Sequence, residues 1–171
     1  MNDSAEEPGP EERARRAYAL CIKLLGARDH SSAELARKLA QRDVDEPSIA
    51  AALTELRAAN YVDDERYART YAEQLAERGR GPMAIRSKLR ERGIDGDLAA
   101  DALEALGADW TERAEVALER RFAASAIGDD DPKARARIAR FLQGRGFGSG
   151  ESIRALDRAR RRLERDTLAD D

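Results

Sequence analysis

Few side chains of this 171-residue chain could do acid–base or nucleophilic chemistry, because it has one histidine and one cysteine. A hydrolytic triad or a histidine-based metal site would need partners that the sequence lacks. His30 directly precedes Ser31, a helix-capping residue type, so packing at the start of a helix is the favoured interpretation. Cys21 lies in an apolar run and is expected to be a small core residue.

Two further motifs could hold a metal or a phosphate. Asp63-Asp64-Glu65 offers three carboxylates, but acids at the start of a helix cap free N–H groups, and this interpretation is favoured. The run 78–82, Arg-Gly-Arg-Gly-Pro, lacks phosphate-loop spacing and follows a helix rather than a strand. It predicts a helix end, a turn and a helix start, with phosphate contact by Arg78 or Arg80 as the alternative. We therefore predict a protein that is not an enzyme and has no catalytic, metal or cofactor site.

The elements that carry these residues repeat three times with a period near fifty residues. Leu39, Leu89 and Leu142 occupy one equivalent position. A second equivalent position, three residues later, holds Arg42, Arg92 and Arg145. Periods of this size indicate an array of supersecondary units, none of which can bury its apolar face alone.

Each repeat is predicted to contain three helices. The middle helix begins in three different ways: a capping box at Ser31 and Glu34, then Gly81-Pro82, then Asp131-Pro132. Apolar residues at helical spacing mark the first and third helices. For the first helices they are Tyr18, Ile22, Leu25; Tyr67, Tyr71, Leu75; and Ala114, Leu118, Phe122. For the third helices they are Ile49, Leu53, Leu56; Ala99, Leu103, Leu106; and Ile153, Leu156.

The sequence therefore predicts an all-α fold: a tandem array of three three-helix repeats, about nine helices, elongated and curved. The expected repeats cover 13–60, 61–108 and 109–163, between an acidic disordered tail at 1–12 and an acidic tail at 164–171. The longest apolar run, from Ala17 to Leu25, is far shorter than the roughly 20 residues that span a bilayer. No secretory signal pattern is evident. We expect a cytoplasmic protein without membrane contact.

The net charge of −3 conceals an uneven distribution. Residues 1–12 contain five acids and no base, and residues 164–171 contain four acids and one base. The body between them has 30 basic and 25 acidic residues, and its third repeat is the most basic, with 13 against 9. This pattern favours a polyanionic or acidic partner, screened by the tails. The alternative is that arginine-rich helices only keep a solvated face.

Three motifs in this order resemble the bacterial RecX family. They are Arg28-x-His30-Ser31-x-x-Glu34-Leu35-x-x-Lys38-Leu39, then Tyr61-Val62-Asp63-Asp64-Glu65-Arg66-Tyr67-Ala68, then Gly81-x-x-x-Ile85-x-x-x-Leu89-x-x-x-Gly93-Ile94. The resemblance runs from about Ala14 to Leu163. It assigns structural roles to His30, Ser31, Glu34, Leu35, Leu39, Asp63, Asp64, Tyr67, Gly81, Leu89, Gly93 and Ile94.

The resemblance implies a regulator of the RecA recombinase. Members of this family are curved arrays of three-helix repeats that lie in the groove of the RecA filament on single-stranded DNA. They inhibit ATP hydrolysis, strand exchange and co-protease activity by RecA, and so temper DNA repair and the SOS response. The implied partner is the RecA nucleoprotein filament, with weak binding to free single-stranded DNA. The chain itself is expected to be a monomer.

The family has no fixed contact motif, so the placement of charge selects the candidate contact residues for RecA or DNA. They are Arg113, Arg120, Arg121, Arg135, Arg137, Arg140, Arg145, Arg158, Arg161 and Arg162. Two other classes remain open. A helix-turn-helix DNA-binding protein would concentrate base-reading side chains on one helix, and no helix here does so. A solenoid adaptor for peptides would expose an apolar or aromatic stripe, whereas the aromatic residues here are at core spacing.

Overall fold

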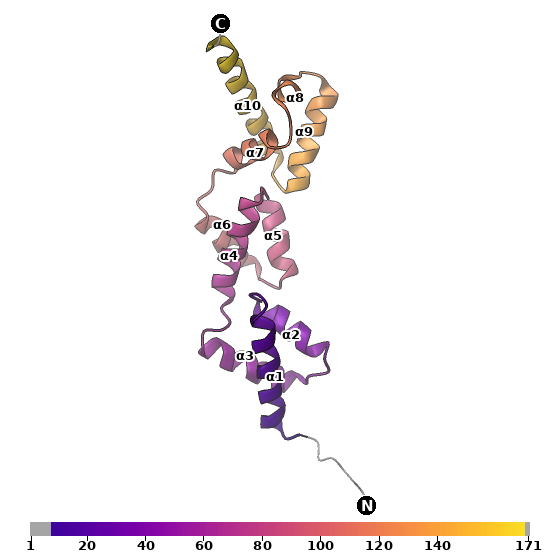
Figure 1. The fold of residues 1–171 in the computed structure, drawn as a ribbon, viewed down its shortest axis with the longest axis vertical. Helices are drawn as coiled ribbons and strands as arrows, with labels where there is room; N and C mark the ends of the chain where they lie inside the picture. Colours follow the sequence, from indigo (N-terminus) through magenta and orange to yellow (C-terminus); the bar gives the residue numbers. More distant parts are fainter. Residues whose placement is uncertain (1–7, 170–171) are drawn as a thin grey trace, which may run out of the picture. The chain divides into compact units, whose positions relative to one another are not determined.

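The computed structural model describes residues 8–169, which form ten α-helices and no strand (Figure 1). The all-α prediction is thus confirmed. The helices are α1 Pro10–Leu25, α2 Ser32–Ala40, α3 Glu46–Ala58, α4 Asp64–Glu77, α5 Pro82–Glu91, α6 Gly96–Ala105, α7 Trp110–Glu119, α8 Ala124–Gly128, α9 Pro132–Arg145 and α10 Ser149–Ala169. Within the described range, none is long and apolar enough to cross a bilayer.

Short polar side chains cap the starts of helices α2, α3, α6 and α7. Ser31, Asp45, Asp95 and Asp109 each accept a hydrogen bond from a backbone N–H in the first turn of the next helix. The short helix α8 is the element that the sequence did not predict. It lies between α7 and α9, so the third repeat has four helices where three were expected.

The repeat pattern has a direct structural counterpart in the middle helices α2, α5 and α9. Leu39, Leu89 and Leu142 are all fully buried. Each of these helices is followed by a residue with positive φ at the same repeat position: Asp43 at 58°, Gly93 at 76° and Gly146 at 90°. Glycine adopts this left-handed conformation at little cost, which lets the chain reverse direction there.

The chain divides into two compact units whose border does not follow the repeats. Unit 1 comprises the residues up to Ala68 together with Glu91–Ile94. Unit 2 comprises Arg69–Arg90 and the residues from Asp95 on. Four residues at the end of α5 and directly after it therefore belong with the first repeat.

Unit 1 is built on the packing of α1 against α3, with α2 against both. Its core includes Leu35, Leu39, Leu56 and the thiol of Cys21, all fully buried. The prediction that Cys21 is a core residue is confirmed. The core face of α1 differs from the predicted one. Ala17 and Cys21 are buried, whereas the predicted residues Tyr18, Ile22 and Leu25 lie at the edge of the cluster.

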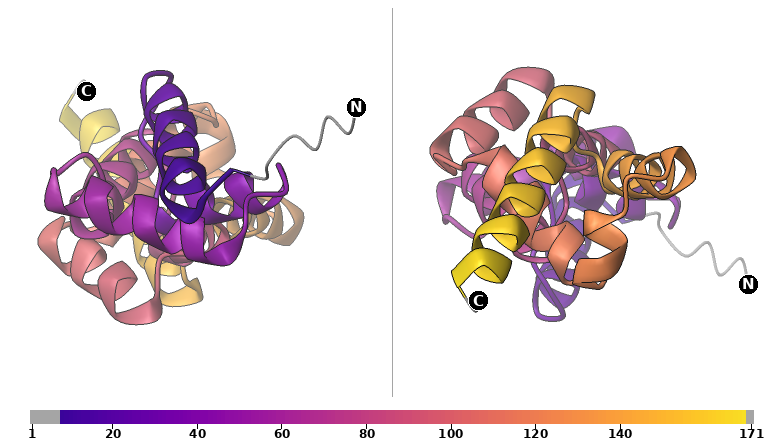
Figure 2. Two further views of the ribbon diagram at one scale, coloured as in Figure 1. Left: turned by 90° about the horizontal axis from the view of Figure 1, so that it is seen from below. Right: turned by 90° about the horizontal axis from the view of Figure 1, so that it is seen from above.

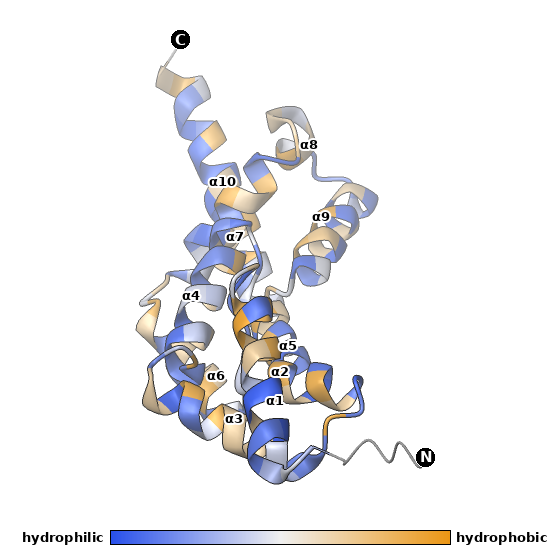
Figure 3. Ribbon diagram, turned by 60° about the horizontal axis from the view of Figure 1, so that its bottom comes forward, coloured by the Kyte–Doolittle hydropathy of each residue, from blue (hydrophilic) through white to orange (hydrophobic). Residues whose placement is uncertain are grey.

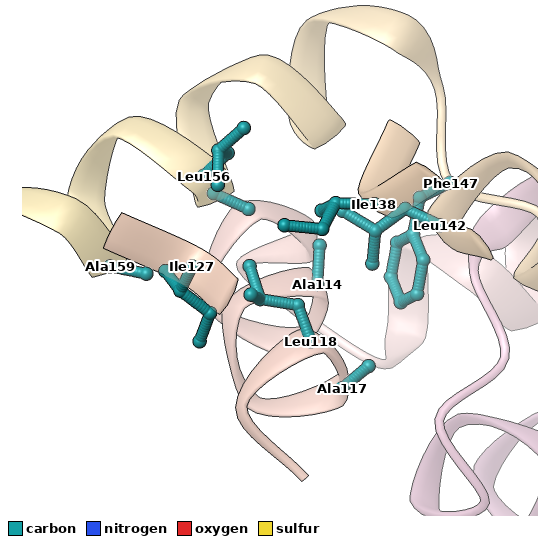
Figure 4. Close-up of a cluster of buried hydrophobic side chains, with 10 residues drawn as sticks. Ala114, Ala117, Leu118, Ile127, Ile138, Leu142, Phe147, Leu156 and Ala159 are labelled. Carbon is teal, nitrogen blue, oxygen red and sulfur yellow. The ribbon is translucent and has the colours of Figure 1, made fainter. Parts of the chain in front are cut away.

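The third repeat, in unit 2, has its own core. Helix α10 packs against α7, α8 and α9, and the right view of Figure 2 shows it in yellow alongside them. The side chains that point toward one another in Figure 4 come from all four helices and from Phe147. The predicted core position Ile153 is wrong, since 61% of this residue is exposed. The buried face of α10 instead follows Ser152, Ala155, Leu156 and Ala159.

Both predicted acidic tails overlap helices. Helix α1 begins at Pro10, so Glu11 and Glu12 lie in its first turn, near the positive end of the helix dipole. Helix α10 continues to Ala169, which places Glu164 and Asp166 on a helix whose exposed length is mostly hydrophilic (Figure 3). Residues 1–7 and 170–171 of the predicted tails lie outside the described residues.

Candidate functional site

The first of two corresponding contacts between repeats lies in unit 1, where the start of α2 meets the residues that follow α5. We call this contact, made by Ser31, Ala33 and Glu34 with Arg92 and Gly93, the first joint. Ser31 Oγ accepts a hydrogen bond from the N–H of Glu34 and donates one to the carbonyl of Arg92. A Cβ on Gly93 would lie 2.3 Å from the Cβ of Ala33, so only glycine fits at this position.

The buried carboxylate of Glu34 is the centre of the first joint. Two NH groups of Arg28 donate to its oxygens at 2.8 and 3.3 Å, and Arg92 donates to Oε1. The hydroxyl of Tyr67 donates to Oε2 at 3.1 Å. Burial by itself would raise the pKa of Glu34, but the hydrogen bonds and charges of the two guanidinium groups lower it to about 2. The predicted capping box is therefore half right: Ser31 caps the helix, while Glu34 binds these three side chains.

Three other motif residues complete this end of unit 1. Asp64 Oδ1 accepts the N–H of Ser32 at 2.7 Å, so α4 contributes a cap to α2. Asp63 accepts the N–H of Arg66 at 2.9 Å. His30 is buried, and its Nδ1 donates to the carbonyl of Arg28 at 2.9 Å because that carbonyl can only accept. Burial lowers the pKa of His30, which favours the neutral ring. These acids and His30 thus hold helix ends.

The second joint occupies the corresponding position in unit 2, where Gly81 and Met83 at the start of α5 meet Arg145 and Gly146 at the end of α9. It is made by the backbone. The N–H of Gly81 donates to the carbonyl of Arg145 at 2.8 Å, and the N–H of Met83 donates to the carbonyl of Gly146 at 3.0 Å. A Cβ on Gly81 would lie 2.5 Å from backbone atoms of Gly146.

Beside the second joint lies an open groove of about 690 Å³, which we call the arginine groove. Its walls come from the end of α4, from α7 and from α9. Five arginines and two glutamates contribute to it. The lining residues are Ala76, Glu77, Arg78, Gly79, Glu112, Arg113, Val116, Ala117, Arg120, Arg121, Phe141 and Arg145. The structure therefore brings together four of the predicted contact residues: Arg113, Arg120, Arg121 and Arg145.

Aromatic rings position several of these arginines. The guanidinium of Arg145 lies 5.2 Å from the ring centroid of Phe141, and that of Arg121 lies 5.5 Å from the centroid of Phe122. Arg113 lies 5.9 Å from the ring of Trp110. The rings of Phe122 and Phe141 pack edge to face at 87°. Stacking holds a guanidinium over a ring while its N–H groups remain available for an anion.

The other predicted contact residues lie outside the arginine groove. Arg158 pairs with Asp109 at 3.2 Å, Arg135 approaches Asp130 at 3.6 Å, and Arg162 binds Glu115 and Glu119. Arg137 stacks on Phe122, Arg140 donates to the carbonyl of Ala136 in its own helix, and Arg161 is exposed on α10.

The candidate contact set omitted two arginines. Arg78, which the sequence offered only as an alternative phosphate contact, lines the arginine groove directly after α4, as Arg120 does directly after α7. Aligning the ends of these two first helices would have added it to the set. Arg160 holds α8 to α10, because it donates to the carbonyls of Ile127 and Asp129 and to the carboxylate of Asp130. Asp130 is thus an ion-pair partner of Arg160.

The fold is that of a helical repeat protein with an arginine-lined groove. Three family profiles match successive parts of the chain: RecX, first three-helix domain, at 17–56; RecX, second three-helix domain, at 63–103; and RecX, third three-helix domain, at 108–156. The chain belongs to the RecX family, and its three tandem domains are those of that family.

Full-length relatives and solved structures agree with this assignment. The chain is 34% identical over 161 residues to Regulatory protein RecX of Stenotrophomonas maltophilia (strain R551-3), covering 92% of this chain and 97% of the relative. It is 36% identical over 149 residues to Regulatory protein RecX of Halorhodospira halophila, covering 87% and 89%. The crystal structure of RecX from Lactobacillus salivarius has the same fold, with a TM-score of 0.75 at 23% identity over 90% of this chain and 98% of that one.

Proposed function

We propose that this protein regulates the RecA recombinase by binding the RecA filament on single-stranded DNA and slowing its ATP hydrolysis, strand exchange and co-protease activity. The observation that carries the proposal is the similarity over nearly the whole chain to proteins named Regulatory protein RecX. RecA filaments form on DNA inside the cell, so the proposed place of action is the cytoplasm, in DNA repair and the SOS response.

The proposed mechanism uses binding alone. A repeat protein that prefers one conformation of the filament shifts the filament toward it, and turnover slows without any chemistry by the regulator. The arginine groove supports this mechanism because guanidinium groups can bind phosphates or acidic side chains of a nucleoprotein filament. Its arginines come from three separate elements, which fits a surface contact better than a single DNA-reading helix.

The test is the rate of ATP hydrolysis by RecA already assembled on single-stranded DNA. Added protein should lower this rate, and it should hydrolyse no ATP by itself. The inhibition should weaken as salt rises if arginine contacts carry the binding. The order of addition is the control. Inhibition only when the DNA is coated before RecA is added would identify a competitor for bare DNA, and binding to the filament would then be wrong.

A further inference from the structure

We propose that the arginine groove binds the phosphodiester backbone of single-stranded nucleic acid without reading its sequence, and that the bound strand fastens the second repeat to the third. This inference builds on the proposed function, in which single-stranded DNA is part of the target. It adds the chemical group bound, the residues that bind it and the structural effect of binding.

The five arginines of the groove have no carboxylate partner in the described part of the chain, unlike the three paired arginines on the neighbouring helix α10. Within residues 8–169, none of the five arginines of the groove forms an ion pair, although Glu77 and Glu112 lie on the same walls. By contrast, Arg158, Arg160 and Arg162 are all paired with acids. Unpaired guanidinium groups that face one groove match the paired oxygens of phosphate groups.

The aromatic residues near the groove favour phosphates over bases. Phe141 is the only aromatic residue in the lining, and it is half-buried against the core of the third repeat. Its ring is covered by Arg145 and by the ring of Phe122. Base stacking on an exposed ring adds about 1–3 kcal/mol per base to single-strand binding. Because this ring is occupied, the affinity should depend on charge and should be independent of sequence.

Two of the groove arginines belong to opposite sides of the second joint. Arg78 follows α4 in the second repeat, and Arg145 ends α9 in the third. The guanidinium of Arg145 already donates to the carbonyl of Arg78 at 3.2 Å, while the carbonyl of Arg145 accepts the N–H of Gly81. A strand whose phosphates contact both side chains crosses this joint. A ligand that binds only when the second joint is formed stabilises that joint by linkage.

An acidic peptide is the competing ligand class, since carboxylates also pair with guanidinium groups. Such a peptide would gain affinity from exposed apolar side chains in the groove. The groove has little exposed apolar surface, because Val116 is the only large apolar side chain of the lining that is exposed, with 39% of its surface accessible. The arrangement of charge therefore favours phosphates.

The experiment measures binding of the full-length protein to labelled dT and mixed-sequence single strands of about 16 nucleotides, the upper end of usual site sizes. The groove variant is Arg113→Gln with Arg120→Gln. The matched control is Arg86→Gln with Arg90→Gln, which removes two exposed charges of α5 outside the groove. The groove variant should bind both strands at least tenfold more weakly at low salt and lose roughly 1.4 from the salt slope. The control should stay within about twofold.

Hydrogen exchange tests the fastening of the joint. Adding the dT strand to the unaltered protein should slow exchange of the Gly81 and Met83 amides, which bond across the second joint. The amide of Glu34 in the first joint, which bonds to Ser31 Oγ, serves as the internal control and should not change. Equal slowing at both joints, or none at Gly81 and Met83, would contradict the fastening.

Two results would overturn the choice of ligand: equal binding by the groove variant and its control, or a polyglutamate peptide that displaces the strand at equal charge concentration. The RecA assay separates this inference from the proposed function. Protein that inhibits preformed filaments but shows no groove-dependent strand binding would refute the inference alone. Protein that binds strands through the groove but never inhibits RecA would refute the proposed function alone.

Discussion

The first and second joints occupy corresponding positions in successive repeats, but side-chain hydrogen bonds and ion pairs hold the first, and backbone hydrogen bonds hold the second. In both, a carbonyl at or directly after the end of the middle helix accepts a hydrogen bond from the preceding repeat. The hydroxyl of Ser31 donates to the carbonyl of Arg92, whereas the backbone N–H of Gly81 donates to that of Arg145. The equivalent arginines also differ, since Arg92 pairs with the buried Glu34 and Arg145 pairs with no acid of the described chain.

One sequence difference accounts for this. The fifty-residue period aligns Glu34 with Ala84, so the second joint has no carboxylate for Arg145. The guanidinium of Arg92 is neutralised by Glu34 and so stabilises unit 1. That of Arg145 stacks on Phe141 and donates to the carbonyl of Arg78, but its charge is not neutralised by an acid of the described chain. The alanine at position 84 therefore leaves a positive charge in the arginine groove that the first joint neutralises with Glu34.

The largest effect is expected from Gly81→Ala. The new Cβ would meet backbone atoms of Gly146 at 2.5 Å, and backbone cannot yield as a flexible side chain does. We expect a loss of about 3 kcal/mol in the free energy of unfolding, measured by urea denaturation. Gly144→Ala is the matched control, because its Cβ meets nothing within 4 Å in a helix. That change should stabilise by about 0.5–1 kcal/mol. Equal effects of the two substitutions would show that close approach does not hold the second joint.

Glu34→Gln should have the next largest effect and should be specific to unit 1. It leaves Arg28 and Arg92 without their carboxylate, and we expect a loss of about 2 kcal/mol at neutral pH. This is less than for a fully buried pair, because both arginines are partly exposed and can turn toward water. The midpoint of urea unfolding is the measurement. An unchanged midpoint would mean that the cluster contributes nothing net.

The same cluster predicts a pH dependence with a definite sign. The pKa of Glu34 is about 2 in the folded protein, below its ordinary value of 4.5. Its contribution to stability is therefore complete above about pH 4.5 and is lost as the pH falls toward 2. In hydrogen exchange between pH 5 and 3, the Leu35 amide near the first joint should lose protection before the Met83 amide at the second. In Glu34→Gln this difference should vanish.

The repeat, the buried leucines and the two glycines in left-handed turns were within reach of the sequence. Spacing and residue type fix Leu39, Leu89 and Leu142, and glycine at 93 and 146 indicates a left-handed turn. The partners of Glu34 were not predictable, because a capping glutamate has the same local pattern whether it turns back to its own helix or toward Arg92. The arginine groove depends on which helix ends meet, and charge counts along the chain do not contain that information.

The smallest effect is expected from Arg42→Ala. Arg42 is equivalent to Arg92 and Arg145, but it is exposed, and within the described part of the chain it donates only to the carbonyl of Lys38 in its own turn. Removing it should change the free energy of unfolding by less than about 0.5 kcal/mol. Arg92→Ala is the comparison and should cost clearly more, because it opens the Glu34 cluster. A loss at Arg42 as large as that at Arg92 would show that this arginine position stabilises its own turn rather than a joint.

The burial of Cys21 makes its thiol a probe for the opening of unit 1. Its thiol is fully enclosed beside Leu35 and Leu39, and burial raises its pKa, which disfavours the reactive thiolate. Because the chain has no other cysteine, a thiol reagent can label the protein only when this core opens. The labelling rate therefore reports how often unit 1 opens in solution, and a ligand that stabilises only unit 2 should leave that rate unaltered.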